Sequence, residues 1–459
     1  MNRKPDPNGL SNPASSPQKN PLSRRFSQVR AHTLRLAQPL SAEDCQAQSM
    51  PDASPVKWHL AHVTWFFETF VLEAFEPHFK PHNPAFKVLF NSYYNAVGDK
   101  HPRPQRGLLT RPTLAEVLDW REAVDARVLE VLASSNHQPA AHRQVTDLVE
   151  LGLQHEQQHQ ELLLTDIKHL LSCNGLRPVY RSAWPLAQVA PVTLQWLEFA
   201  GGLSAIGCDS GHDGFVFDNE TPRHQQYLRP YALANRLITH GEWLEFMQDG
   251  AYGDARWWLS AGWDWVRAQQ IGAPLYWTHN TAGQGNAGWR SFTLHGEVPI
   301  DPHTPITHIS YFEADAFARW KSATDSSCRG ARLPTEFEWE GAVAPHESAL
   351  RSAGNFVESG ALHPMPVARA PRDFATGLMQ ALGDVWEWTS SSYQPYPGYQ
   401  PWAGAVGEYN GKFMVNQYVL KGGSCATPAD HIRASYRNFF PTDARWQFSG
   451  LRLARDGAV

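Results

Sequence analysis

The stretch LGLQHEQQHQELLLTDIKHLL, residues 151–171, combines a helical repeat of leucines with two histidines four positions apart. Residues at this spacing lie on one face of an α-helix, so His155 and His159 can present both imidazoles to a single metal ion. Residues 155–159 also match the H-E-x-x-H pattern of zinc metalloproteases. The stretch predicts a long helix that carries a metal site, and it leaves the chemistry of that metal open.

A zinc-protease hypothesis lacks a third ligand. The longer H-E-x-x-H-x-x-G-x-x-H form is absent, and no glutamate follows Glu161 until Glu198, beyond the helical region. His169 belongs to the same helix, but it lies about 21 Å along the axis from His155 and cannot share its metal.

A better third ligand lies upstream, in SPVKWHLAHVTWFFE at residues 54–68. His59 and His62 fall on a different predicted helix, where either could also be an ordinary surface histidine. Three neutral imidazoles would leave coordination positions open, which suits a reactive metal rather than a closed structural site. Ligand softness alone permits zinc, iron or copper.

Composition bounds the classes of protein that the chain can belong to. A length of 459 residues with 42% hydrophobic and 19% charged residues predicts two globular domains. A net charge of −5 favours neither nucleic acid nor a membrane surface as a partner. Five scattered cysteines, without a secretory signal or a long apolar run, predict reduced thiols and a cytoplasmic location.

The pattern along the chain divides it into four parts. Residues 1–20 are rich in Pro, Asn and Ser and predict a disordered tail. Residues 21–176 contain four long helical patterns, which favour an up-down bundle. A linker is expected at 177–191, followed by an α+β domain at 192–459. The irregular connection at 81–112 is long enough to suggest a function of its own.

Several motifs together resemble one family. The motifs in the first part of the chain are residues 54–68 and 155–169. Those in the second part are FVFDNETPRH (215–224), ARLPTEFEWEGA (331–342), GDVWEWTSSSYQPYPGY (383–399) and HIRASYRNFFP (431–441). From about residue 25 to 456, the chain resembles the EgtB-type hercynine sulfoxide synthases of ergothioneine biosynthesis. This resemblance implies a DinB-like four-helix bundle followed by a formylglycine-generating-enzyme-like α+β domain of the C-type-lectin type.

The resemblance also implies a chemistry. By match to the family pattern, His62, His155 and His159 would bind Fe(II), His59 would support the site or be structural, and Gln158 would contact the hercynine imidazole. The family reaction uses dioxygen to join a cysteine-type thiol to carbon 2 of the hercynine ring and to oxidise the sulfur to a sulfoxide.

The long connection matches two further parts of the family site. Its NSYYN segment supplies Tyr94, the favoured proton donor, and Tyr93 as the second choice, although both could be packing residues. Arg103 and Arg106 match the clamp for the carboxylate of the thiol substrate, and a planar guanidinium suits that anion.

Aromatic residues near the C-terminus are candidates for binding the trimethylammonium group of hercynine, which cannot donate a hydrogen bond. Phe439 and Phe440 match a family substrate segment, and Trp446 is added from RWQF. Core packing is the alternative for each, and for Trp446 it is an equally good explanation.

Other functions stay open on sequence grounds. The GGSCATP segment holds only Cys425, so the cysteine pair that binds copper in formylglycine-generating enzymes is missing. A 5-histidylcysteine sulfoxide synthase of the ovothiol type, a zinc hydrolase and a binding module without catalysis are the alternatives. The expected partners are small molecules, with cysteine and γ-glutamylcysteine both possible as the thiol. Both domains are expected to supply the active site.

Overall fold

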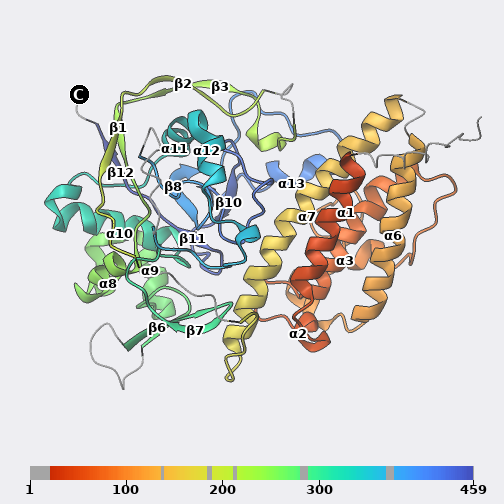
Figure 1. Cartoon of the computed structure of the whole chain (residues 1–459), viewed down its shortest axis with the longest axis horizontal. Helices are drawn as coiled ribbons and strands as arrows, with labels where there is room; N and C mark the ends of the chain where they lie inside the picture. The colour runs from red at the N-terminus through yellow and green to blue at the C-terminus, as the bar shows by residue number, and fades with distance from the viewer. Residues whose placement is uncertain are drawn as a thin grey trace, which may run out of the picture.

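The computed structural model describes residues 21–135, 139–182, 189–209, 214–279, 288–367 and 377–457. The tail expected at residues 1–20 lies outside these ranges. Figure 1 shows a helical half beside a half rich in strands, with helix α7 (Pro139–Cys173) running between them. The chain is therefore a mixed α and α+β protein, and the stretch at 151–171 lies where its two halves meet.

Four long helical segments make up the bundle, and α7 packs against the other three. They are α1 (Pro21–Ala37), α3 (Val56–Phe66) with its π-helical continuation (Phe67–Leu72) and α4 (Glu73–Phe75), α6 (Leu114–Ser135) and α7. Short helices α2 (Ala42–Gln46) and α5 (Phe86–Leu89) lie in the connections. The connection at 81–112 is otherwise irregular apart from a 3-10 turn at Arg103–Leu108.

Gly152 allows α7 to approach α3 closely. A Cβ atom at this position would come within 2.5 Å of the Phe67 ring and 3.0 Å of the Phe66 ring. The Phe66 ring in turn lies 4.9 Å from the His155 imidazole, centroid to centroid. The π-helical turn at 67–72 adds a residue at this contact, a distortion that often occurs beside functional sites.

The face of α7 that points into the bundle carries a buried ion network. Glu156, the glutamate of the H-E-x-x-H pattern, is fully buried and accepts hydrogen bonds from Arg30, Arg121 and the Thr33 hydroxyl. Burial would raise the pKa of Glu156, but the two guanidinium groups outweigh it and lower that pKa to about 2. Glu156 is therefore a structural anion, held away from the histidines on either side of it.

The described residues of the second half form four small sheets surrounded by helices. The central sheet has the order β10 (Asn438–Pro441), β9 (Gln417–Lys421), β8 (Trp386–Ser392), β11 (Ser449–Gly450). A second sheet has the order β1 (Trp196–Phe199), β4 (Tyr231–Ala234), β12 (Ala454–Asp456). The remaining two are β2 (Gly202–Ile206) with β3 (His224–Leu228), and β5 (Trp277–His279), β6 (Trp289–Thr293) and β7 (Gly296–Pro299).

Helices cover these sheets, and several begin with a reciprocal capping box. The helix expected in SYFEADAFARWKSAT forms α10 (Tyr311–Thr324), where the Ser310 hydroxyl and the Glu313 carboxylate each satisfy a backbone N–H of the other. The other helices of this half are α8 (His240–Gln248), α9 (Ser260–Gln269), α11 (Glu336–Val343), α12 (Glu347–Ser352) and α13 (Glu408–Gly411).

A polar stripe on α7 joins the two halves. Glu161 is buried and accepts hydrogen bonds from the Ser424 and Thr427 hydroxyls at 2.5 and 2.6 Å and from the Trp386 indole at 2.9 Å. Lys168 lies two turns further along the same face, with its Nζ 2.6 Å from His308 Nε2. Polar side chains satisfied across the interface hold α7 in one register against the sheet domain.

All five cysteines are free thiols. Among the described helices, none combines the length and the apolar character that crossing a bilayer would need.

Replacing Glu156 by Gln should destabilise the fold by on the order of 3 kcal/mol, because Arg121 would keep its buried charge without a counter-ion. The exposed pair Lys87–Glu73 provides the control, and Glu73→Gln should cost less than about 1 kcal/mol. Urea unfolding at pH 7 measures both changes.

The same anion predicts a pH dependence. The folded pKa of Glu156 lies below its unfolded value of about 4.3. Its contribution to stability is therefore complete above about pH 4.3 and is lost as the pH falls towards 2. Over that range, the difference in unfolding free energy between the native protein and Glu156→Gln should shrink; a constant difference would contradict the ion network.

Candidate metal and substrate site

Three buried histidines meet at the junction of α3 and α7. One ring nitrogen from each of His62, His155 and His159 lies within 4.8 Å of the others. The pairwise ring centroids are 4.6 to 5.0 Å apart. The three residues proposed from the sequence as metal ligands are thus brought together, and the helical spacing of 155 and 159 accounts for two of them.

The imidazoles are in a form that can bind a metal. Burial lowers the pKa of His62 and of His159, and it lowers the pKa of His155 to about 4, so all three rings are neutral at pH 7. His62 Nδ1 lies 2.6 Å from the Phe90 carbonyl oxygen; as the donor it leaves Nε2 as the free lone pair. His155 Nδ1 is buried without a hydrogen-bond partner among the described residues. This donor set fits a divalent transition metal with open coordination positions.

His59 lies behind the ligands rather than among them. Its Nδ1 is 2.8 Å from His159 Nδ1, and its Nε2 is 3.0 Å from Asp166 Oδ2. If His59 donates to the carboxylate, its Nδ1 accepts from His159 and leaves His159 Nε2 for the metal. Histidine ligands in metal sites are commonly oriented by such a partner.

The histidines line a cavity of about 210 Å³ whose walls come from both halves of the chain. All the residues proposed from the sequence for the site contribute to it. They are His62, Tyr93, Tyr94, Arg103, Arg106, His155, Gln158, His159, Phe439, Phe440 and Trp446.

Arg106 is buried beside the histidines without a carboxylate partner among the described residues. Its guanidinium donates to the hydroxyls of Ser54 and Ser92, both at 2.9 Å. It also lies 3.4 Å above the Trp58 ring, which stacks on His62 at 4.5 Å. Burial lowers the pKa of Arg106 to about 9, so an anion bound here would restore a favourable environment for its charge.

Arg103 is hydrogen-bonded to Tyr93, whereas Tyr94 is packed among aromatic rings. Arg103 donates to the Tyr93 hydroxyl at 2.7 Å and to the backbone carbonyl of Asp52. Tyr94 is buried, with its ring against Trp65 at 5.6 Å, and burial raises the pKa of its hydroxyl. Tyr93 is thus engaged by the arginine, whereas the Tyr94 hydroxyl keeps its proton at neutral pH.

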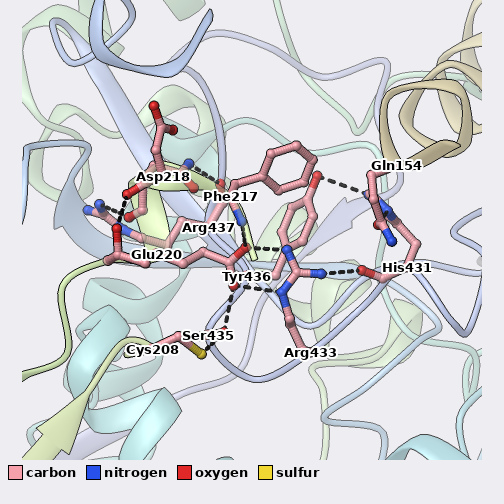
Figure 2. A network of polar contacts seen from close by, with 12 residues as sticks. Gln154, Cys208, Phe217, Asp218, Glu220, His431, Arg433, Ser435, Tyr436 and Arg437 are labelled. Atoms are coloured by element: carbon pink, nitrogen blue, oxygen red, sulfur yellow. Dashed lines mark hydrogen bonds and ion pairs between the residues drawn. The ribbon is translucent and has the colours of Figure 1, made fainter. Parts of the chain in front are cut away.

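Gln158 begins a chain of hydrogen bonds that crosses the domain interface. Its Nε2 donates to the Tyr436 hydroxyl at 2.7 Å, which lies 3.1 Å from His431 Nε2, and His431 Nδ1 lies 2.7 Å from Gln154 Oε1. Figure 2 shows Tyr436 and His431 beside the ion pair of Arg433 with Glu220, which Ser435 also joins. These contacts fix the Gln158 amide, whose Oε1 is left as an acceptor.

The sheet domain contributes aromatic side chains to the cavity. Phe439 stacks on Tyr393 at 4.1 Å, and Phe440 meets Trp446 edge-on at 5.9 Å. Both phenylalanines belong to β10, the edge strand of the central sheet. Trp386 of β8 also lines the cavity.

Sequence reasoning missed several residues of the site. Tyr436 and His431 lie inside the HIRASYRNFFP motif but were not singled out, and neither was Asp166; Tyr409 carried no local signal. Asp166 is seven residues beyond His159 and therefore on the same face of α7, a spacing that could have identified it.

Comparisons with known proteins agree with this architecture. Residues 25–163 match the DinB superfamily, and residues 193–457 match the sulfatase-modifying factor enzyme 1-like domain. A formylglycine-generating enzyme of Streptomyces coelicolor is 31% identical, over 56% of this chain and 87% of its own length.

Hercynine oxygenases are among the relatives that match nearly the whole chain. The hercynine oxygenase of Mycolicibacterium thermoresistibile is 32% identical over 96% of each protein. The hercynine oxygenase of Mycobacterium tuberculosis is 31% identical over 95% of this chain and 98% of its own length. The chain therefore belongs to the hercynine oxygenase family and is an oxidoreductase built from a DinB-like bundle and a formylglycine-generating-enzyme-like domain.

Proposed function

We propose that this protein is a non-haem Fe(II) enzyme that uses dioxygen to join cysteine or γ-glutamylcysteine to carbon 2 of the hercynine imidazole, with oxidation of the sulfur to a sulfoxide. The supporting observation is the neutral set of His62, His155 and His159 in a cavity that also holds an unpaired arginine and an aromatic wall. Fe(II) in this set would activate dioxygen and offer the thiolate sulfur a coordination position.

The proposed reaction balances without an external reductant. Forming the C–S bond releases two electrons and forming the S–O bond releases two more, and one dioxygen accepts all four. One of its oxygen atoms becomes the sulfoxide and the other becomes water. The two protons of that water come from the thiol and from carbon 2 of the imidazole.

The residues of the cavity divide the work of binding. Arg106 would hold the carboxylate of the thiol, with Arg103 beside it on the Tyr93 hydroxyl. Gln158 would accept a hydrogen bond from an imidazole N–H through Oε1, because its Nε2 already donates to the Tyr436 hydroxyl. Phe439, Phe440 and Trp446 would enclose the trimethylammonium group, for which aromatic faces are suitable partners.

Tyr94 would carry the proton. Its buried hydroxyl stays protonated at neutral pH and borders the cavity, so it can pass a proton during the reduction of oxygen. Tyr93 is the second candidate, but its hydroxyl already accepts a hydrogen bond from Arg103.

A zinc hydrolase is disfavoured by the position of Glu156. In an H-E-x-x-H hydrolase this glutamate acts as the general base. Here it is buried between Arg30 and Arg121, and it is not among the residues that line the cavity.

The experiment that tests the function is aerobic turnover of the Fe(II)-loaded protein with hercynine and either cysteine or γ-glutamylcysteine. We expect one sulfoxide conjugate per dioxygen consumed, measured by product mass and oxygen uptake. Histidine replaces hercynine in a parallel reaction to test the ovothiol-type alternative. No conjugate with either thiol, in protein that holds iron, would overturn the proposal.

The affinity for the metal should depend strongly on the three proposed histidine ligands and less strongly on His59. His155→Ala should abolish binding of Fe(II) or Co(II), and His59→Gln should weaken it about 10- to 100-fold because His159 loses its orienting partner. His169→Ala is the matched control on the same helix, since His169 contacts Ser49 outside the cavity. Titration of the metal-free protein with Co(II), followed by its absorption bands, measures all three; equal affinity in His59→Gln and the native protein would contradict the role of His59.

The two tyrosines should separate in turnover. Tyr94→Phe should lower kcat for sulfoxide formation by about 100-fold while the metal affinity stays unchanged, because general acid–base groups contribute effects of this size. Tyr93→Phe should mainly raise KM for the thiol, since the Arg103 guanidinium would lose one contact. Stopped-flow measurement of product formation with both variants distinguishes them; the reverse pattern would assign the proton to Tyr93.

A further inference from the structure

Among the residues that the structure describes, three carboxylates line the cavity, and only one of them is both buried and incompletely bonded. They belong to Asp52, Glu161 and Asp166. Asp52 is exposed to solvent, and both oxygens of Glu161 accept hydrogen bonds from the second domain. Asp166 is 6% exposed, and its Oδ1 has no partner among the described residues.

The other oxygen of Asp166 is fully used. Oδ2 accepts from the backbone N–H of Ser54 at 2.8 Å and lies 3.0 Å from His59 Nε2. These two contacts hold the carboxylate of this cavity-lining residue in place, so Oδ1 is a fixed, buried acceptor without a partner among the described residues. A buried oxygen of this kind costs free energy unless a donor reaches it.

The Arg106 guanidinium, which carries the opposite charge, contacts Ser54 as well. The Ser54 hydroxyl accepts from Arg106, so Ser54 touches the carboxylate through its backbone and the guanidinium through its side chain. Asp166 is close enough that its charge acts to raise the pKa of Arg106, against the larger effect of burial. Arg106 is 4% exposed and its Nε also lacks a partner among the described residues.

Asp166 and Arg106 both contact Ser54, and each has a polar atom without a partner among the described residues. This pair of opposite charges matches an α-amino acid in its zwitterionic form. The α-carboxylate and α-ammonium of such a molecule are attached to one carbon and carry opposite charges. A charge-assisted hydrogen bond at each end would satisfy both protein groups at once.

We propose that Asp166 and Arg106 form an α-amino-acid subsite, in which Oδ1 accepts from the ammonium and the guanidinium binds the carboxylate of the thiol substrate. This inference rests on the proposed function and selects among its substrates. Cysteine has both charges. In γ-glutamylcysteine the same nitrogen is an amide, neutral and with a single hydrogen, and a bulky acyl group would have to fit against the buried Asp166 side chain.

Thiols that differ only at nitrogen test the subsite. They are cysteine, 3-mercaptopropionate, which lacks the amino group, and N-acetylcysteine, which has it acylated. In the native iron enzyme with hercynine, we expect kcat/KM for cysteine to exceed that for each analogue by about 10-fold or more, the range for a hydrogen bond between charged groups. In Asp166→Asn, the ratio of cysteine to 3-mercaptopropionate should fall towards one.

Two variants serve as controls for this ratio. Asp52→Asn removes the other incompletely bonded carboxylate of the cavity and should leave the ratio at its native value. His59→Gln keeps an N–H donor for Asp166 Oδ2 but removes the Nδ1 acceptor from His159, so it should affect both thiols equally. A ratio that is lost in His59→Gln as well would assign the effect to the metal site and overturn the inference.

Binding without turnover separates this inference from the proposed function. The Co(II)-substituted protein reports a bound thiolate by a sulfur-to-cobalt charge-transfer band, which gives a Kd for each thiol in the absence of dioxygen. Tighter binding of cysteine than of 3-mercaptopropionate, lost in Asp166→Asn, supports the subsite even if no sulfoxide forms. Active enzyme with no preference for cysteine, or with γ-glutamylcysteine preferred, overturns the subsite and leaves the proposed function standing.

Discussion

The structure depends on the 3.6-residue period of α7, which gives one helix three faces with three different environments. One face buries Glu156 against the arginines of the bundle. The next presents His155 and His159 to the cavity, and the third presents Glu161 and Lys168 to the sheet domain. Because the same helix takes part in all three contacts, the bundle core, the candidate metal ligands and the domain interface cannot shift independently of one another.

The carboxylates on this helix show how surroundings set the role of a side chain. The charge of Glu156 is balanced by two guanidinium groups. The carboxylate of Glu161 instead accepts hydrogen bonds from three donors of the other domain. Asp166 has one oxygen with two partners and one oxygen with none among the described residues. All three side chains are carboxylates, so their roles differ because the fold brings a different number of hydrogen-bond donors to each oxygen.

The cavity also requires both domains for a physical reason. The bundle supplies the imidazoles and Arg106, which are cationic or neutral, whereas the sheet domain supplies the aromatic wall and Tyr436, which fixes the Gln158 amide. Neither half encloses a volume by itself, since Glu161 and Gln158 would face solvent without the sheet domain. Exclusion of water from the buried arginine is therefore a property of the assembled chain.

Much of the site followed from local pattern. The spacing of His155 and His159 determined that their imidazoles share a helix face, and the motifs at 54–68 and 431–441 identified His62 and the phenylalanines through a family resemblance. Only the tertiary structure decided that Glu156 serves the core, because the sequence does not reveal which face of a helix meets two buried arginines. It likewise decided that His59 supports His159 and that Asp166 lies beside Arg106, since the contacts concerned join residues 52 to 112 positions apart. Periodicity is a local property that the chain carries in itself, whereas partnership between distant polar groups exists only once the helices have packed.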